Sequence, residues 1–163
     1  MKRILVSGCV VVMAVLVSSV LLAQSNSRPS YGTWKMNAAA TKFNPGPVPK
    51  NLTQTETAEG DGVKVSVEGT NGDGTQFAWS YTANYDGKDN PISGTGAPNG
   101  ADTVALIMKA DNSVQQTFKK DGKMVMLART VVSQDGASKT IRAKGTDADG
   151  HKVFRSIILD KQQ

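Results

Sequence analysis

The chain is poor in the residues that most often build metal centres and nucleophilic sites. It has one cysteine, Cys9, and one histidine, His151, among 163 residues. Cys9 falls in an apolar leader, so the remaining chain has no thiol for a disulfide, a thiolate metal site or a cysteine nucleophile. A single histidine also excludes the usual zinc sites. We therefore expect no metal and no other cofactor, and a fold stabilised by burial and hydrogen bonding.

Long apolar runs are scarce as well, and the one that exists stands at the start. Lys2 and Arg3 precede an apolar run over residues 4–22, which is the layout of a secretory signal. Small residues at its end predict cleavage after Ser25, or alternatively after Ala23. An uncleaved membrane anchor is the other interpretation, because 19 residues can just span a bilayer.

The leader sets the expected compartment and domain. The sequence from Val6 to Cys9 resembles the lipobox of bacterial lipoproteins, but only five residues precede it, so we interpret Cys9 as part of the leader and keep a lipoprotein as the alternative. The predicted signal peptide is 1–25, and 26–163 is long enough for a single domain with one core. We expect a secreted or periplasmic protein.

A strong charge of one sign is also missing. Without Lys2 and Arg3, 17 basic residues face 14 acidic ones. The lysines are spread among turns and outward strand positions, with no cluster of aromatic residues between them. This favours a solvated surface over nucleic-acid binding. We expect a monomer whose only membrane contact is an uncleaved leader.

Sustained helical periodicity is absent, and turns take its place. The best helix candidate, residues 37–43, is stopped by the prolines of residues 44–47. Asp-Gly, which suits the positive φ angles of type I′ hairpins, recurs along the chain. Its copies are at 61–62, 73–74, 86–87, 121–122, 135–136 and 149–150, with weaker turns at 98–100 and 111–112.

These eight reversals are spaced 10 to 14 residues apart and predict nine strands. Residues 32–36 would add a tenth. The pattern predicts an all-β fold, an antiparallel up-and-down meander of about ten strands that closes into a barrel. A two-sheet sandwich is the alternative, since both arrangements remove exposed sheet edges.

Alternation assigns an inner face to several strands. Phe77, Trp79 and Tyr81 share one face, and Phe118 repeats the pattern in a later strand. The same reasoning, with less regular alternation, places two arginines inward, Arg129 and Arg155. A buried arginine needs a partner. Our hypothesis is that one or both bind the acidic head of an apolar ligand. The alternative is a reversed phase, or arginines that reach solvent from strand ends.

The opening Gly32-x-Trp34, the meander and a last-strand arginine resemble the calycin group of lipocalins and fatty-acid-binding proteins. In that group the tryptophan closes one barrel end and the arginine packs across its ring. The resemblance implies a closure made by Gly32, Trp34 and Arg155. A cation over an indole contributes roughly 0.5 to 2 kcal/mol.

Residues 32–35, Gly-Thr-Trp-Lys, are closest to the fatty-acid-binding type, whose barrel has ten strands. Two features differ from it: no pair of helices follows the first strand, and Ser156-Ile157 replaces the rest of an Arg-x-Tyr motif. The chain also resembles a group of small secreted bacterial proteins through residues 32–35, 42–47 and 85–89. That resemblance implies a compartment and no chemistry.

Three function classes remain. The first is a barrel that binds a small apolar or amphipathic molecule, with Phe77, Trp79, Tyr81 and Phe118 lining the interior and Arg129 or Arg155 as a polar anchor. The second is a fully packed barrel or sandwich that acts as a structural or interaction module. The third is an enzyme using scattered carboxylates. We predict no enzyme and no catalytic residues, because His151 follows a turn and Asp147 and Asp149 lack the pattern of a calcium loop.

Overall fold

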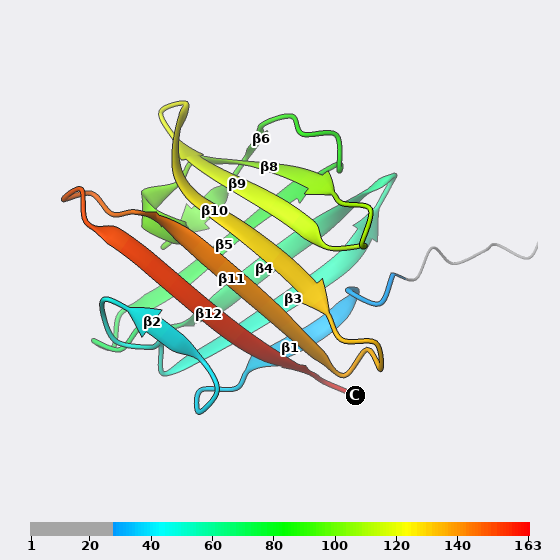
Figure 1. Cartoon of the computed structure of the whole chain (residues 1–163), viewed down its shortest axis with the longest axis horizontal. Coiled ribbons are helices and arrows are strands. Elements are labelled where there is room, and N and C mark those ends of the chain that lie inside the picture. Colours follow the sequence, from blue (N-terminus) through cyan, green and yellow to red (C-terminus); the bar gives the residue numbers. More distant parts are fainter. Residues whose placement is uncertain (1–27) are drawn as a thin grey trace, which may run out of the picture.

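The computed structural model describes residues 28–163, which form one antiparallel sheet of twelve strands curled into a barrel (Figure 1). The predicted leader, its cleavage site and Cys9 lie outside these residues. The strands are β1 Gly32–Met36, β2 Lys42–Asn44, β3 Asn51–Glu59, β4 Gly62–Thr70, β5 Gln76–Ala83, β6 Asn90–Pro91, β7 Ser93–Thr95, β8 Thr103–Met108, β9 Val114–Lys120, β10 Lys123–Val132, β11 Ser138–Thr146 and β12 Lys152–Lys161.

The strand order follows the chain. Strands β8 to β12 pair in sequence, β12 then pairs with β1, and β1 continues through β3 and β4 to β5. This confirms the predicted all-β, up-and-down meander closed into a lipocalin-like or fatty-acid-binding-like barrel. Nine strands have five residues or more, and β2, β6 and β7 are shorter.

The barrel closes weakly between β5 and β8. An isolated bridge joins Asp86 to Ile107, and the Gly87 N–H donates to the Leu106 carbonyl at 2.9 Å. The predicted tight hairpin at Asp86-Gly87 is therefore wrong, because these residues bond to β8, and the segment that returns to pair with β5 is β7. Pro91 and Pro98 then interrupt the long connection, and proline cannot donate to a strand ladder.

One Asp-Gly copy has the backbone that the type I′ prediction requires. Asp121 and Gly122, between β9 and β10, have φ angles of 50° and 73°. At 135–136 only Gly136 has a positive φ, of 70°, and the Ser133 and Asp135 side chains complete a longer loop. The dipeptide thus marks reversals without fixing one turn type.

The helix predicted over residues 37–43 is wrong. Residues 38–40 form a turn, and Lys42–Asn44 instead form β2, which pairs with β12 beyond the end of β1. Strand pairing satisfies the backbone groups along that part of β12, whereas a two-turn helix would be marginal by itself. In the described residues, η1 (Pro98–Gly100) is the sole helical segment. No helix among them is long and apolar enough to cross a membrane.

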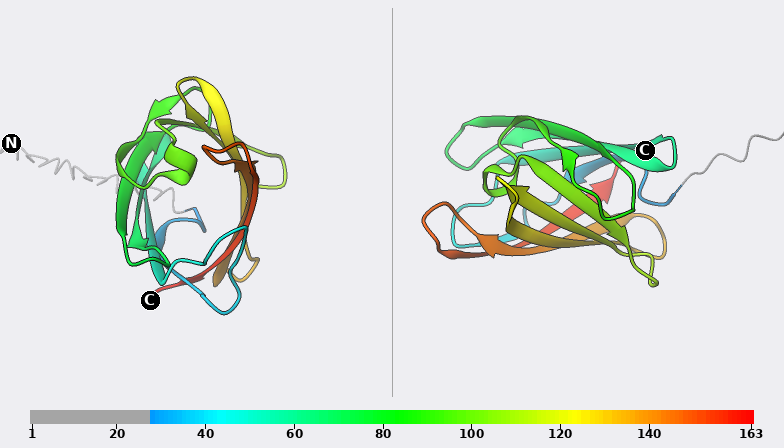
Figure 2. Two further views of the ribbon diagram at one scale, coloured as in Figure 1. Left: turned by 90° about the vertical axis from the view of Figure 1, so that its left-hand side faces the viewer. Right: turned by 90° about the horizontal axis from the view of Figure 1, so that it is seen from above.

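The core lies inside the barrel, and η1 lies across the ring of strands at one end (Figure 2). Val63, Val65 and Val67 alternate with exposed polar residues along β4, and all three are buried on the inner face. The buried apolar residues of the interior include Phe77, Tyr81, Val104, Leu106, Phe118, Met126, Ala128, Ala143 and Val153.

Candidate functional site

A cavity of about 570 Å³ occupies the barrel end opposite η1. Residues 28–30 and the turns after β8 and β10 surround its mouth. Its wall combines apolar and polar side chains. The aliphatic lining includes Val63, Val65, Leu106, Met108 and Val114. The polar lining comprises residues of the mouth, among them Arg28, Asp111 and Asn112, and deeper side chains, which are those of Glu56, Tyr81, Gln116 and Thr130.

A smaller chamber of about 70 Å³ lies deeper, toward η1. Val65, Tyr81 and Gln116 line both spaces, so these three residues form the boundary between them. Trp79, Phe118 and other large side chains fill the rest of that half. The barrel interior is therefore open at one end and packed at the other.

The polar residues at the boundary keep hydrogen-bonding capacity for a ligand. The Thr130 hydroxyl donates to Gln116 Oε1 at 2.9 Å, which orients the Gln116 amide. Burial, with a contribution from the negative charge of Glu56, raises the pKa of the Tyr81 phenol well above its usual value. Tyr81 therefore stays protonated at neutral pH and presents an O–H donor.

The mouth is covered in part by the segment before β1. The Arg28 guanidinium lies over the Tyr85 ring, 4.4 Å from its centroid. The Tyr31 hydroxyl donates to the Gly62 carbonyl at 3.2 Å. Burial raises the pKa of Tyr85 to about 12, and the nearby Arg28 charge acts in the opposite direction. These contacts hold residues 28–31 against the entrance.

Trp34 packs at the barrel end that carries the cavity mouth, and two lysines, not an arginine, lie over its ring. It is fully buried and donates Nε1–H to the Ser30 carbonyl at 2.9 Å. Lys139 Nζ lies 4.3 Å from the Trp34 ring centroid, and Lys161 Nζ lies 5.2 Å from it. The expected packing of Arg155 across Trp34 does not occur. In the pairing of β1 with β12, Trp34 lies opposite Lys161 and Met36 lies opposite Leu159, so Arg155 is far from the Trp34 ring.

Lys139 is the most unusual of these residues. Its side chain is 0% exposed, and its ammonium lies 2.7 Å from Glu56 Oε1, which also accepts from Gln54 at 2.6 Å. Burial lowers the pKa of Lys139, and the Glu56 carboxylate opposes that change.

The opening Gly32 has a φ of 122°, and a Cβ there would lie 3.2 Å from the Lys161 side chain. Glycine thus suits the start of β1.

Arg155 lies at the opposite end, and of the two orientations left open by the sequence it takes the inward one. It lines the smaller chamber, donates to Asn99 Oδ1 at 2.9 Å and lies 5.1 Å from the Phe43 ring centroid. No carboxylate of residues 28–163 lies within 4.0 Å of its guanidinium. Burial lowers the pKa of Arg155. Its charge is therefore only partly compensated.

Arg129 does not point inward, so the alternative of a reversed phase holds for β10. Met126, Ala128 and Thr130 are the inward residues of this strand, and Arg129 lies on the other face. Arg129 is exposed and pairs with Asp111 and the Ser113 hydroxyl. The sequence left the phase open because both faces of β10 carry apolar residues.

The predicted aromatic residues separate into two groups. Tyr81 lines both interior spaces, whereas Trp79 and Phe118 line the smaller one. Trp79 stacks on Tyr81 with centroids 6.1 Å apart and meets Phe118 edge to face at 6.1 Å. Phe77 lines neither space and packs in the core. Their roles in ligand binding remain predictions.

Sequence reasoning missed much of the polar lining. Glu56 and Gln54 lie on β3, whose sequence has no apolar alternation, and Lys139 looked like a surface residue beside a turn. The usable signal was Gln116, which stands in phase with Val114 and Phe118. A polar residue between two inward apolar ones is typical of a lined interior.

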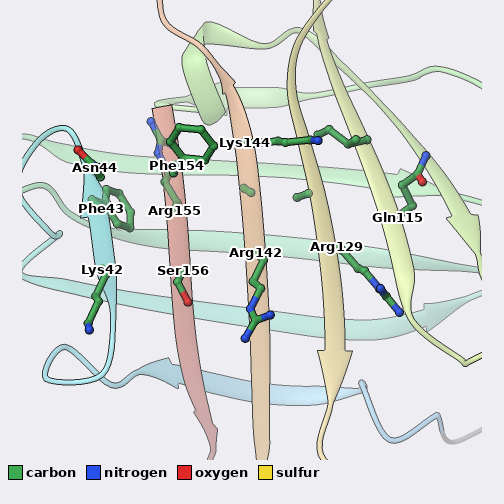
Figure 3. Close-up of a pocket in the computed structure, with 13 residues that line it drawn as sticks. Lys42, Phe43, Asn44, Gln115, Arg129, Arg142, Lys144, Phe154, Arg155 and Ser156 are labelled. Carbon is green, nitrogen blue, oxygen red and sulfur yellow. The ribbon is translucent and has the colours of Figure 1, made fainter. Parts of the chain in front are cut away.

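A second hollow, an open groove of about 490 Å³, lies on the outer face of β9 to β12 beside β2 (Figure 3). Phe154, Leu127 and the aliphatic stems of Arg142 and Lys144 line it. The basic residues of this groove form a cluster, which corrects the prediction that the basic residues are spread over the surface. Cross-strand register brings together side chains far apart in sequence: Lys42, Arg129, Arg142 and Lys144.

The turn between β11 and β12 contains the sole histidine. Ligand atoms of Asp147, Asp149 and His151 lie within 4.8 Å of one another. Asp147 Oδ1 accepts the backbone N–H groups of Asp149 and His151 at 3.0 and 2.8 Å. Those bonds explain the cluster as turn structure, and they lower the pKa of Asp147.

Comparison with known proteins gives one structural likeness. No family model matches the chain, and no curated protein sequence matches it. A crystal structure of zebrafish ileal bile acid-binding protein complexed with cholic acid aligns with a TM-score of 0.48 at 10% sequence identity, covering 83% of this chain and 100% of that chain. A likeness of this extent transfers no function from one chain to the other.

Proposed function

We propose that the barrel binds one small amphipathic molecule inside the cavity opposite η1. The observation that carries this proposal is the cavity of about 570 Å³ within the barrel. Ligand sites usually measure roughly 300 to 1,000 Å³ and combine an apolar wall with a few polar groups. A barrel filled by its own side chains would leave no space of this size.

The wall chemistry defines the ligand class. Val63, Val65 and Leu106 offer apolar contact, so most of the ligand is hydrocarbon. The Tyr81 hydroxyl and the Gln116 amide would bond to a hydroxyl, carbonyl or ether oxygen. Glu56 already bonds to Lys139, so the base of the cavity adds no free charge.

An acidic group on the ligand would find its partner beyond the boundary. Arg155 lines the smaller chamber without a carboxylate partner, and that chamber adjoins the cavity at Tyr81 and Gln116. An ionised carboxylate reaching it would form a charge-assisted hydrogen bond in a site with little water. We therefore favour a ligand with an apolar body and an acidic end.

The test uses 1-anilinonaphthalene-8-sulfonate, an amphipathic anion whose fluorescence rises in apolar surroundings. We expect the probe to bind the predicted mature protein, residues 26–163, and we expect Val65→Phe to abolish this binding by filling the boundary between the two interior spaces. Ser66→Phe is the matched control, because Ser66 is the next residue of β4 and is exposed on the outer face. Equal binding by both variants would rule out the interior site. Native mass spectrometry of the unfractionated protein then shows whether a ligand co-purifies.

The alternative is an interaction module without a ligand. The packed half of the interior, around Phe77, Phe118 and Met126, favours it. It becomes the better description if the probe binds neither the parent nor any variant. In both cases we propose a monomer without enzymatic activity.

The compartment follows from the leader. We propose that residues 1–25 direct export and are removed, leaving a secreted or periplasmic barrel. N-terminal sequencing of protein recovered from outside the cytoplasm tests this: a start at Asn26 supports it, a start at Gln24 indicates the alternative site, and an intact leader contradicts cleavage.

A further inference from the structure

The outer face of β10 to β12, with β2, carries rows of side chains in cross-strand register. Arg129 stands opposite Arg142, Arg142 opposite Ser156, and Ser156 opposite Lys42. The next row places Leu127 opposite Lys144 and Lys144 opposite Phe154. We call this surface, defined by Lys42, Leu127, Arg129, Arg142, Lys144 and Phe154, the basic face.

The basic face has uncompensated positive charge. Like charges directly opposite each other destabilise a strand pair, and Arg129 and Arg142 are such a pair. Asp111 pairs with Arg129. Within residues 28–163, no carboxylate lies within 4.0 Å of the charged groups of Lys42, Arg142 or Lys144. An anionic partner would offset this repulsion.

The same face exposes large apolar side chains. The exposed fractions are 52% for Phe154, 43% for Val131 and 62% for Met124. All three project outward from β10 or β12, and Phe154 stands beside Lys144 over the groove (Figure 3). The chain holds just one other exposed large apolar residue among those described, Ile107. Apolar and cationic groups therefore share one surface.

The spacing decides what kind of partner fits. The row from Arg129 to Lys42 crosses four strands, and strands lie about 4.8 Å apart, so the row spans roughly 14 Å. A single anionic group cannot reach all of its cations. A surface with many anionic groups can, and the exposed Phe154 and Met124 favour a surface that also admits hydrocarbon. Nucleic acid offers repeated phosphates but no apolar layer.

We propose that the basic face docks on a membrane rich in anionic lipids, with Phe154 at the level of the headgroups. Lys42, Arg142 and Lys144 bind lipid phosphates electrostatically, and Phe154 and Met124 bury apolar surface at the interface. The groove between Phe154 and Arg142 accommodates parts of the lipids. This docking is separate from the interior cavity and does not require a ligand there.

The experiment measures sedimentation of the predicted mature protein, residues 26–163, with vesicles of phosphatidylglycerol mixed equally with phosphatidylcholine. We expect binding that weakens as salt rises and is lost on pure phosphatidylcholine. Arg142→Gln with Lys144→Gln should lower the partition coefficient about 30-fold, because each cation near such a surface contributes roughly fivefold. Phe154→Ser alone should lower the partition coefficient several-fold relative to the parent protein, without changing its salt dependence.

The matched control is Lys50→Gln with Lys64→Gln, which removes the same charge elsewhere on the barrel from exposed positions. Equal loss in both double variants would overturn the proposal in favour of net charge alone. Binding to pure phosphatidylcholine would also overturn it, as would polyphosphate binding with no effect of Phe154→Ser. Val65→Phe, which fills the interior boundary, should leave vesicle binding unchanged and so separates this result from the proposed function.

Discussion

Lys139 and Arg155 are both inward-pointing cations, at opposite ends of one barrel, and their surroundings differ. Lys139 is sealed from solvent and held by the Glu56 carboxylate and the Trp34 ring. Arg155 is half-buried and has an amide oxygen of Asn99 and the Phe43 ring. The first has a full counter-charge within the protein, and the second does not.

This difference separates a structural ion pair from a candidate binding group. A buried pair adds little net stability, yet removal of one partner costs several kcal/mol because the other charge is left without compensation. A cation without a carboxylate can instead take its counter-charge from a ligand. Removal of Lys139 should therefore affect folding, and removal of Arg155 should affect binding.

The largest effect is expected for Lys139→Met, which leaves Glu56 buried without its cation. We expect a loss of about 3 to 5 kcal/mol in the free energy of unfolding, measured by urea titration. Adding Glu56→Leu to this variant should recover much of the loss, because no buried charge then remains. A change below about 1 kcal/mol for Lys139→Met would show that the pair is dispensable.

Next in size is Asn99→Gly, which keeps the positive φ of 50° but removes the side chain. Asn99 Nδ2 donates to the carbonyls of Val125 and Thr146 at 3.2 and 3.0 Å, and its Oδ1 accepts from Arg155. We expect a loss of about 1 to 3 kcal/mol by urea titration. Amide hydrogen exchange should rise first at Gly100 and Ala101, whose N–H groups bond within η1, and uniform exchange across the barrel would contradict a local role.

Arg155→Met should have a smaller effect on stability, below about 1 kcal/mol, because the methionine keeps the packing and removes a cation without a carboxylate partner. Affinity for 1-anilinonaphthalene-8-sulfonate should fall about tenfold, which corresponds to the loss of one charged hydrogen bond. Arg129→Met is the control, since Arg129 lies outside the barrel. Equal affinity losses in the two variants would argue against an anchoring role for Arg155.

The smallest effect concerns alkaline pH. Folding raises the pKa of Tyr85 to about 12 from 10.0, so above pH 10 the unfolded chain releases a proton that the folded chain keeps. Unfolding then becomes more favourable as pH rises. Tyr85→Phe should reduce this loss by less than about 1 kcal/mol at about pH 11, since Tyr85 is partly exposed. Identical pH profiles by thermal melting would contradict the shift.

The sequence revealed the architecture because turn chemistry and strand alternation are local properties. Asp121-Gly122 and the valines of β4 follow these rules directly. The candidate site was harder to predict, because it depends on long-range register. Glu56 and Lys139 are 83 residues apart and meet only when the barrel closes, so no local pattern marks either of them.

The two errors with the largest consequences have the same origin. The hypothesis of an inward Arg129 took the wrong one of two apolar faces of β10, and the candidate helix at 37–43 gave way to β2 pairing with β12. In both places tertiary pairing prevailed over local preference. Cross-strand register also assembled the basic face, which sequence spacing had scattered.

The weak closure between β5 and β8 indicates where the chain could be opened in a circular permutant. The Gln162 N–H donates to the Thr33 carbonyl at 2.9 Å, so the C-terminal end lies beside β1, while the edges of the sheet meet near Asp86 and Ile107. The neighbouring long strands are joined as hairpins except for β12 with β1, for β1 with β3, whose connection contains β2, and for β5 with β8. A circular permutant that links the ends and opens between β7 and η1 would make the pairings of β12 with β1 and with β2 local, and it would keep β5 beside β7. It would also lower the mean sequence separation of contacts and favour faster folding.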